Sequence, residues 1–92
     1  MTANRQRERD EGLRRDMRDT LNDLISQQVL HALGTPDDLF RVQVSPVGDD
    51  RYRVNVLVGT AATSARVAES FFLTVDGDGH ILTSSPEMVR LY

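Results

Sequence analysis

Residues 39–81 read LFRVQVSPVGDDRYRVNVLVGTAATSARVAESFFLTVDGDGHI, and this stretch decides the fold. Three runs within it alternate apolar and polar side chains. The apolar positions are Phe40, Val42 and Val44 in the first run, Tyr52, Val54, Val56 and Val58 in the second, and Phe71, Leu73 and Val75 in the third. Because successive side chains of a strand point to opposite faces, each run presents one apolar face and one more polar face. The alternation therefore predicts a sheet that is buried on one side.

Turn residues separate these runs and set the expected strand limits. We expect strands at about residues 39–45, 51–58, 66–75 and 80–84. Pro46 ends the first strand or marks it as an edge strand, and Gly48-Asp49-Asp50 forms the first hairpin loop. Residues 60–65 are small and polar and predict a flexible connection, with a short helix from Ser64 as the alternative. The apolar tail at residues 87–92 is expected to pack on the domain.

The chain before the sheet predicts one long helix from Leu13 to Leu33. Its apolar residues recur at spacings of three and four, at Leu13, Met17, Leu21, Leu24, Ile25, Val29 and Ala32. Gly34 is a natural helix C-cap, and Pro36 prevents continuation. Residues 1–12 are polar and densely charged, and they form either a frayed terminus or an extension of the helix.

These elements predict an α+β fold, in which one long N-terminal helix packs on a four-stranded antiparallel β-meander of order 1-2-3-4. The chain divides into a polar N-terminal segment, residues 1–12, and a single α-β-β-β-β domain, residues 13–92. The predicted outline is similar to helix-on-curved-sheet folds such as the cystatin-like class, in architecture only.

Composition narrows the classes of function. The 92 residues suffice for one domain with a small core, and the chain has no cysteine, which excludes disulfides and thiol chemistry. No apolar run is long enough to span a bilayer, so we expect a cytoplasmic protein with no membrane partner. The net charge is −3, and all 11 basic residues are arginines. This acidic balance argues against strong nonspecific binding to nucleic acid.

No catalytic or metal motif emerges. The two histidines are not spaced as a helical zinc pair, and there is neither a phosphate-binding glycine loop nor a nucleophile elbow. Ser84 and Ser85 lie near His80, but adjacent strand residues point to opposite faces. Asp76-Gly77-Asp78-Gly79 resembles part of a calcium loop. An EF-hand alignment would place Thr74 and Ser85 where acids are required, so a hairpin turn is favoured. We expect no enzyme, no metal and no cofactor.

Three groups of residues are candidate sites. Leu57, Phe72 and Leu82 have the opposite parity from the main apolar residues and form a candidate interface. Gln28, His31 and Tyr52 are a candidate pocket between helix and sheet, the alternative being a hydrogen-bonded amide and a histidine at the helix C-terminus. Arg41, Gln43, Arg53 and Asn55 would share one face, as a polar platform for an acidic partner or ligand or as a solvated surface.

The leading hypothesis is a small non-enzymatic interaction module that self-associates or binds another protein through the open sheet face. The alternative is a small-ligand-binding domain with a helix–sheet pocket. A third hypothesis is nucleic-acid binding through the arginines of the first 18 residues together with Arg41 and Arg53.

Overall fold

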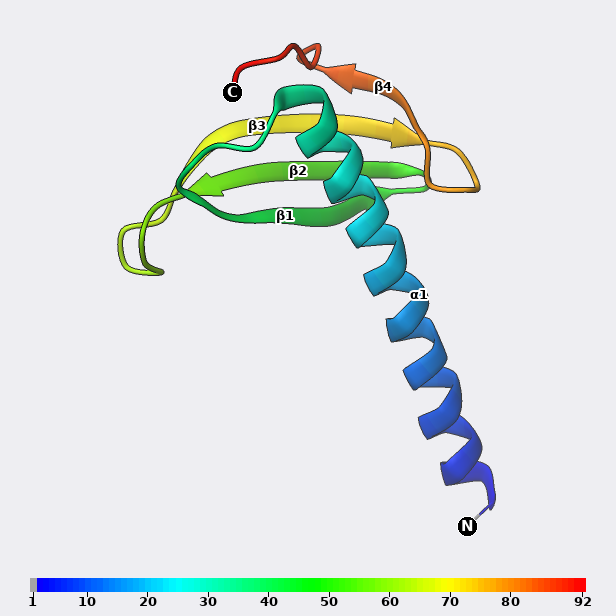
Figure 1. The fold of residues 1–92 in the computed structure, drawn as a ribbon. Coiled ribbons are helices and arrows are strands. Elements are labelled where there is room, and N and C mark those ends of the chain that lie inside the picture. The colour runs from blue at the N-terminus through cyan, green and yellow to red at the C-terminus, as the bar shows by residue number, and fades with distance from the viewer. Residues whose placement is uncertain (1) are drawn as a thin grey trace.

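The computed structural model describes the backbone of residues 2–92 and the side chains of residues 17–92. Helix α1 (Thr2–Leu33) precedes four strands, β1 (Leu39–Gly48), β2 (Arg51–Val58), β3 (Arg66–Val75) and β4 (Ile81–Ser85), as Figure 1 shows. The strands form one antiparallel sheet in the order β1-β2-β3-β4. The predicted α+β fold, with an N-terminal helix and a β-meander, is confirmed.

The limits of the middle strands agree with the alternation, whereas those of the edge strands differ. β1 continues past Pro46, which pairs with Tyr52, and ends at Gly48. An edge strand has a neighbour on one side only, so it tolerates a residue that lacks an N–H group. β4 begins and ends one residue later than expected.

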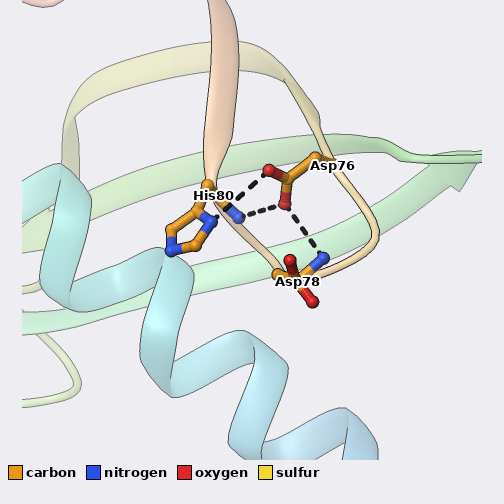
Figure 2. Close-up of side chains that lie close together, drawn as sticks. All are labelled: Asp76, Asp78 and His80. Carbon is orange, nitrogen blue, oxygen red and sulfur yellow. Dashed lines mark hydrogen bonds and ion pairs between the residues drawn. The ribbon is translucent and has the colours of Figure 1, made fainter.

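Two tight hairpins meet at one end of the sheet. Asp49 and Asp50 turn β1 into β2, and Asp50 adopts a φ of 56°, which aspartate tolerates better than most residues. Residues 76–80 turn β3 into β4 (Figure 2). The Val75 N–H donates to the Asp50 carbonyl oxygen at 2.9 Å, so the two turns are tied together.

The end of α1 follows the predicted capping pattern. Gly34 has a φ of +87°, and its N–H donates to the Leu30 carbonyl oxygen at 2.8 Å. The N–H groups of Leu91 and Tyr92 both donate to the Leu33 carbonyl oxygen at 2.9 Å. The backbone of the C-terminal tail therefore docks on the helix end. A side chain at position 34 would collide with the backbone of Tyr92.

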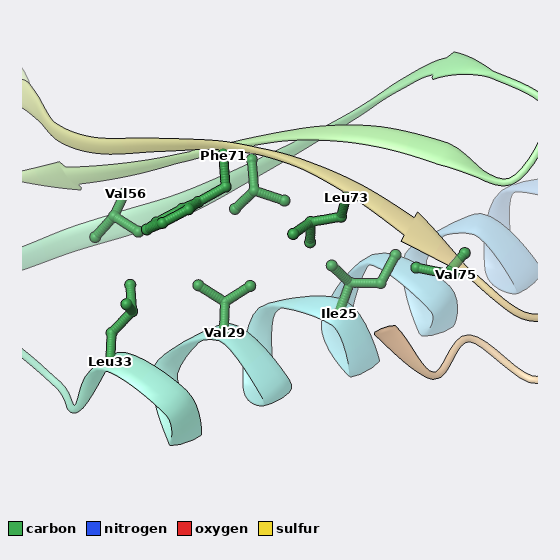
Figure 3. Close-up of a cluster of buried hydrophobic side chains, with 8 residues drawn as sticks. Ile25, Val29, Leu33, Val56, Phe71, Leu73 and Val75 are labelled. Carbon is green, nitrogen blue, oxygen red and sulfur yellow. The ribbon is translucent and has the colours of Figure 1, made fainter. Parts of the chain in front are cut away.

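The core lies between α1 and one face of the sheet. Ile25, Val29 and Leu33 recur every four residues, so they lie on one side of the helix. They face Val54, Val56, Phe71, Leu73 and Val75 from β2 and β3 (Figure 3). Burying each such side chain contributes about 1.5–3 kcal/mol. The buried sheet residues therefore belong to the predicted apolar set of the second and third runs, of which Tyr52 alone is only partly buried, and the helix covers them.

Candidate functional site

The sheet face opposite α1 is the open face. Cross-strand partners point to the same side of a sheet, so the register orders this face into rows. The first three rows are Arg41–Leu57–Val67, Gln43–Asn55–Ser70 and Ser45–Arg53–Phe72–Ser85. The fourth is Gly48–Arg51–Thr74–Thr83. Within the described residues, no helix or strand covers this face (Figure 1).

The second row is a connected line of polar side chains. The Asn55 side-chain amide donates to Gln43 Oε1 at 3.4 Å, and the Ser70 hydroxyl donates to Asn55 Oδ1 at 2.7 Å. Three strands are thereby linked on their exposed side. The structure thus places Gln43 and Asn55 in contact. Arg41 and Arg53 lie on the same face, one row away on either side.

Three arginines project from this face. The guanidinium carbon of Arg53 lies 5.5 Å from the centroid of the Phe72 ring, within the range of a cation–π contact. No carboxylate of residues 17–92 forms an ion pair with Arg41, Arg51 or Arg53. The four rows contain no aspartate and no glutamate. Arg51 was not among the residues predicted for the polar platform, although it has the same parity as Arg53 on the strand.

The three candidate interface residues lie apart along the strand direction. Leu57 belongs to the first row, next to Val67, and Phe72 belongs to the third. The polar second row separates them. Leu82 is exposed but lies at a register shift between β3 and β4, where strict alternation is interrupted. Leu57 and Phe72 therefore lie two rows apart on this face, with polar side chains between them.

A groove of about 530 Å³ opens between α1 and β4. Its lining residues are Leu24, Gln27, Gln28, His31, Ile81 and Met88. Two of the three predicted pocket residues, Gln28 and His31, are among them. Tyr52 is not: it packs against the edge of the core and lines a separate hollow of about 170 Å³ near Phe72. The groove lies between α1 and β4, whereas Tyr52 is on β2 with β3 between the two strands, and local sequence does not reveal which strand borders the groove.

The amide of Gln28 is engaged by the loop between β3 and β4. Its Nε2 donates to the Gly79 carbonyl oxygen at 2.7 Å and to the Leu24 carbonyl oxygen at 3.3 Å. Its Oε1 accepts the Ile81 N–H at 3.0 Å. The hydrogen-bonded amide, one of the two interpretations of Gln28, is what the structure shows. Gln27 and His31 remain as the polar groups that the groove offers to a ligand.

The loop itself gathers Asp76, Asp78 and His80 (Figure 2), whose ligand atoms lie within 4.8 Å of one another. Asp76 Oδ1 accepts the N–H groups of Asp78 and His80, each at 2.9 Å. His80 Nδ1 lies 3.4 Å from Asp76 Oδ2. The hydrogen bond from the His80 N–H is the main cause that lowers the pKa of Asp76 below its usual value.

These contacts are those of a carboxylate that caps its own turn. Thr74, the residue that an EF-hand would need as its first ligand, instead bonds Thr83 across the strands. The hairpin interpretation therefore accounts for the aspartates. Ser84 and Ser85 pair with Leu73 and Phe72, so they point to opposite faces as expected, and the Ser84 hydroxyl donates to the Pro86 carbonyl oxygen.

The predictions for the N-terminal arginines and for the side chains of residues 1–12 lie outside the described side chains. In the part of the chain that is described, no helix combines the length and hydropathy needed to cross a membrane. The chain matches no protein-family model, no curated protein and no solved structure.

Proposed function

We propose that this chain is a non-enzymatic interaction module that binds a protein partner through the open face of its sheet. The observation that carries the proposal is the pairing of Arg53 with Phe72 on that face, beside the ordered row formed by Gln43, Asn55 and Ser70. Arginine and aromatic side chains are enriched where proteins bind one another. Phe72 is 54% exposed, so most of its apolar surface is available to a partner.

Charge favours a different protein over a second copy on this face. A face-to-face dimer would bring together Arg41, Arg51 and Arg53 from both copies, with no acidic residue in any of the four rows. Like charges brought together in an interface are costly. Self-association through the open face, which the apolar parity suggested, is therefore the weaker form of the proposal.

Site-specific photo-cross-linking in the organism that encodes the chain tests the proposal. A benzophenone side chain replaces Phe72 in one variant and Val89 in another. Val89 is 56% exposed but lies in the C-terminal tail, so it is a control matched for exposure. We expect a discrete adduct from position 72 and not from position 89. The mass of the adduct distinguishes cross-linking to a second copy of this chain from cross-linking to another protein. Equal labelling from both positions, or none from position 72, would contradict the proposal.

A second candidate function is binding of a small ligand in the groove between α1 and β4. Its volume of about 530 Å³ is within the range of ligand sites, and its lining combines apolar side chains from Leu24, Ile81 and Met88 with the polar groups of Gln27 and His31. A fragment screen read by amide chemical shifts tests it. We expect shifts at Gln27, His31 and Ile81. Shifts confined to the open face would count against this candidate.

A further inference from the structure

We infer that the partner of the open face is an acidic, extended protein segment, which uses carboxylates to reach Arg41, Arg51 and Arg53. This inference rests on the proposed function and specifies its partner. It starts from a contrast of charge: the chain has a net charge of −3, yet the charged residues of the open-face rows are all arginines. A face that is basic in an acidic chain attracts negative groups to one defined surface.

The arginines are spaced for a strand-like ligand. Arg51 and Arg53 are two residues apart on β2, which corresponds to about 7 Å along the strand. Arg41 is level with Leu57 on the neighbouring strand, and this places its Cα about 14 Å from that of Arg53. An extended segment running along β2 would match them with acids at its first, third and seventh positions.

The groups between the arginines fit the same segment. The row of Gln43, Asn55 and Ser70 lies between Arg53 and Arg41 and offers hydrogen-bonding groups to polar side chains. Phe72 beside Arg53, and Val67 in the row of Arg41, offer contact to apolar side chains. The segment would therefore combine acidic and apolar residues, as a protein chain does and a phosphodiester strand does not.

The acidic turn before Arg51 argues against a nucleic acid on this face. Asp49 and Asp50 directly precede Arg51 in the turn between β1 and β2, whereas the loop of Asp76 and Asp78 lies against α1 on the other side of the sheet. A polyanion that continued past Arg51 along β2 would come to Asp49 and Asp50 and be repelled by their carboxylates. The ring of Phe72 is also covered on one side by the guanidinium of Arg53, which leaves less of it for base stacking.

The experiment is a titration of the isotope-labelled full chain, followed by amide and guanidinium resonances. The probes are a blocked acidic peptide with glutamate at its first, third and seventh positions, the same peptide with glutamine at those positions, and an oligothymidylate strand. We expect the acidic peptide to shift resonances of Arg41, Arg53 and Ser70, with a dissociation constant that rises as salt increases from about 20 to about 300 mM. The glutamine peptide should bind at least about fivefold more weakly.

Two variants assign the effect to the arginines. Replacing Arg51 and Arg53 together by glutamine should lower the affinity for the acidic peptide about fivefold or more. Arg66→Gln is the control: Arg66 is exposed and belongs to β3, but it pairs with the buried Val58 and so lies outside the four rows. Arg66→Gln should leave the affinity unchanged. An equal loss in both variants would overturn the inference.

The outcomes separate this inference from the proposed function. Equal binding of the acidic and glutamine peptides, no shift on the open face, or tighter binding of oligothymidylate would each overturn the acidic segment as partner. The adduct from position 72 is measured without any assumption about charge. The proposed function therefore stands if that adduct forms with a protein that lacks an acidic segment, and it fails if no adduct forms.

Discussion

Gln28 on α1 donates a hydrogen bond from Nε2 to the Gly79 carbonyl oxygen at 2.7 Å, across 51 residues of sequence. Its Oε1 accepts the N–H of Ile81 at 3.0 Å. One amide thus satisfies a backbone acceptor in the loop before β4 and the backbone donor of Ile81, the first residue of β4. Gln28 thereby links the helix to the start of the edge strand, beside the groove that Met88 lines.

Replacing Gln28 by alanine should lower the free energy of unfolding by about 1–3 kcal/mol, because it leaves partly buried backbone groups of Gly79 and Ile81 without partners. Urea unfolding measures the change. Gln27→Ala is the control, since Gln27 is the exposed neighbour on the same helix, and its effect should stay within about 0.5 kcal/mol. Equal effects of the two substitutions would show that the amide of Gln28 does not hold the loop.

Gly79→Ala should destabilise the domain by about 1–3 kcal/mol. Gly79 has a φ of +86°, and a Cβ there would come within 2.6 Å of Leu21 Cδ1 and 2.9 Å of Leu24 Cδ2. Both the backbone conformation and the contact with α1 oppose a side chain. Gly77→Ala is a matched control in the same loop, because a Cβ at position 77 would meet no atom within 4 Å. A thermal unfolding midpoint lower for Gly77→Ala than for Gly79→Ala would contradict the docking of the loop on the helix.

β2 and β3 show best how much of the fold and of the candidate site could be predicted from the sequence. The alternation from Tyr52 to Val58 and from Phe71 to Val75 depends only on neighbouring residues, so it revealed both the strands and the core face. Arg41, Gln43, Arg53 and Asn55 were assigned to one face for the same reason. Arg51 has the same parity and was accessible to the same argument.

The remaining features depend on pairing between distant segments. The register shift opposite Leu82 is a property of β3 and β4 together, so the parity of Leu82 alone did not place it. Tyr52 is on β2 and the groove opens between α1 and β4, so their separation depends on where α1 lies on the sheet. The docking of Gly79 on Leu21 needs both the helix and the loop in place. None of these appears in a local pattern.

The titration of Asp76 should show a pKa below 3.8, the ordinary value for this side chain, because the carboxylate accepts the N–H of His80 and, next in effect among the hydrogen bonds, that of Asp78. A folded-state pKa below the unfolded one adds stability above the unfolded pKa, and this stability is lost as the pH falls through the folded pKa. The stability difference between the wild type and Asp76→Asn should therefore shrink as the pH falls through that range. Carbon-13 resonances of the carboxyl group report the midpoint, and a peptide of residues 73–83 gives the reference. Identical midpoints in chain and peptide would contradict the turn geometry.

Truncating the core on the helix side should be costly. Ile25→Ala removes a fully buried side chain that faces Leu73 and Val75, so the free energy of unfolding should fall by about 2–5 kcal/mol. Met17 is 72% exposed on the same helix, and Met17→Ala should change the free energy of unfolding by less than about 0.5 kcal/mol. Urea denaturation separates the two. A large loss at Met17 would mean that a second surface covers the helix in solution.

Removing the contact between Arg53 and Phe72 tests whether the Phe72 side chain serves binding or the stability of the fold. Phe72→Ala removes an aromatic side chain that is 54% exposed, and the cation–π contact it loses is worth about 0.5–1 kcal/mol at exposed sites. Phe71 is the buried neighbour of Phe72 and points to the other face of the sheet. Phe71→Ala should lower the free energy of unfolding by about 3–5 kcal/mol. Calorimetric unfolding measures both variants, and the acidic-peptide titration is then repeated on Phe72→Ala. We expect weaker binding with nearly unchanged stability. If Phe72→Ala unfolds as readily as Phe71→Ala, Phe72 supports the fold, and its exposure is no evidence for a binding role.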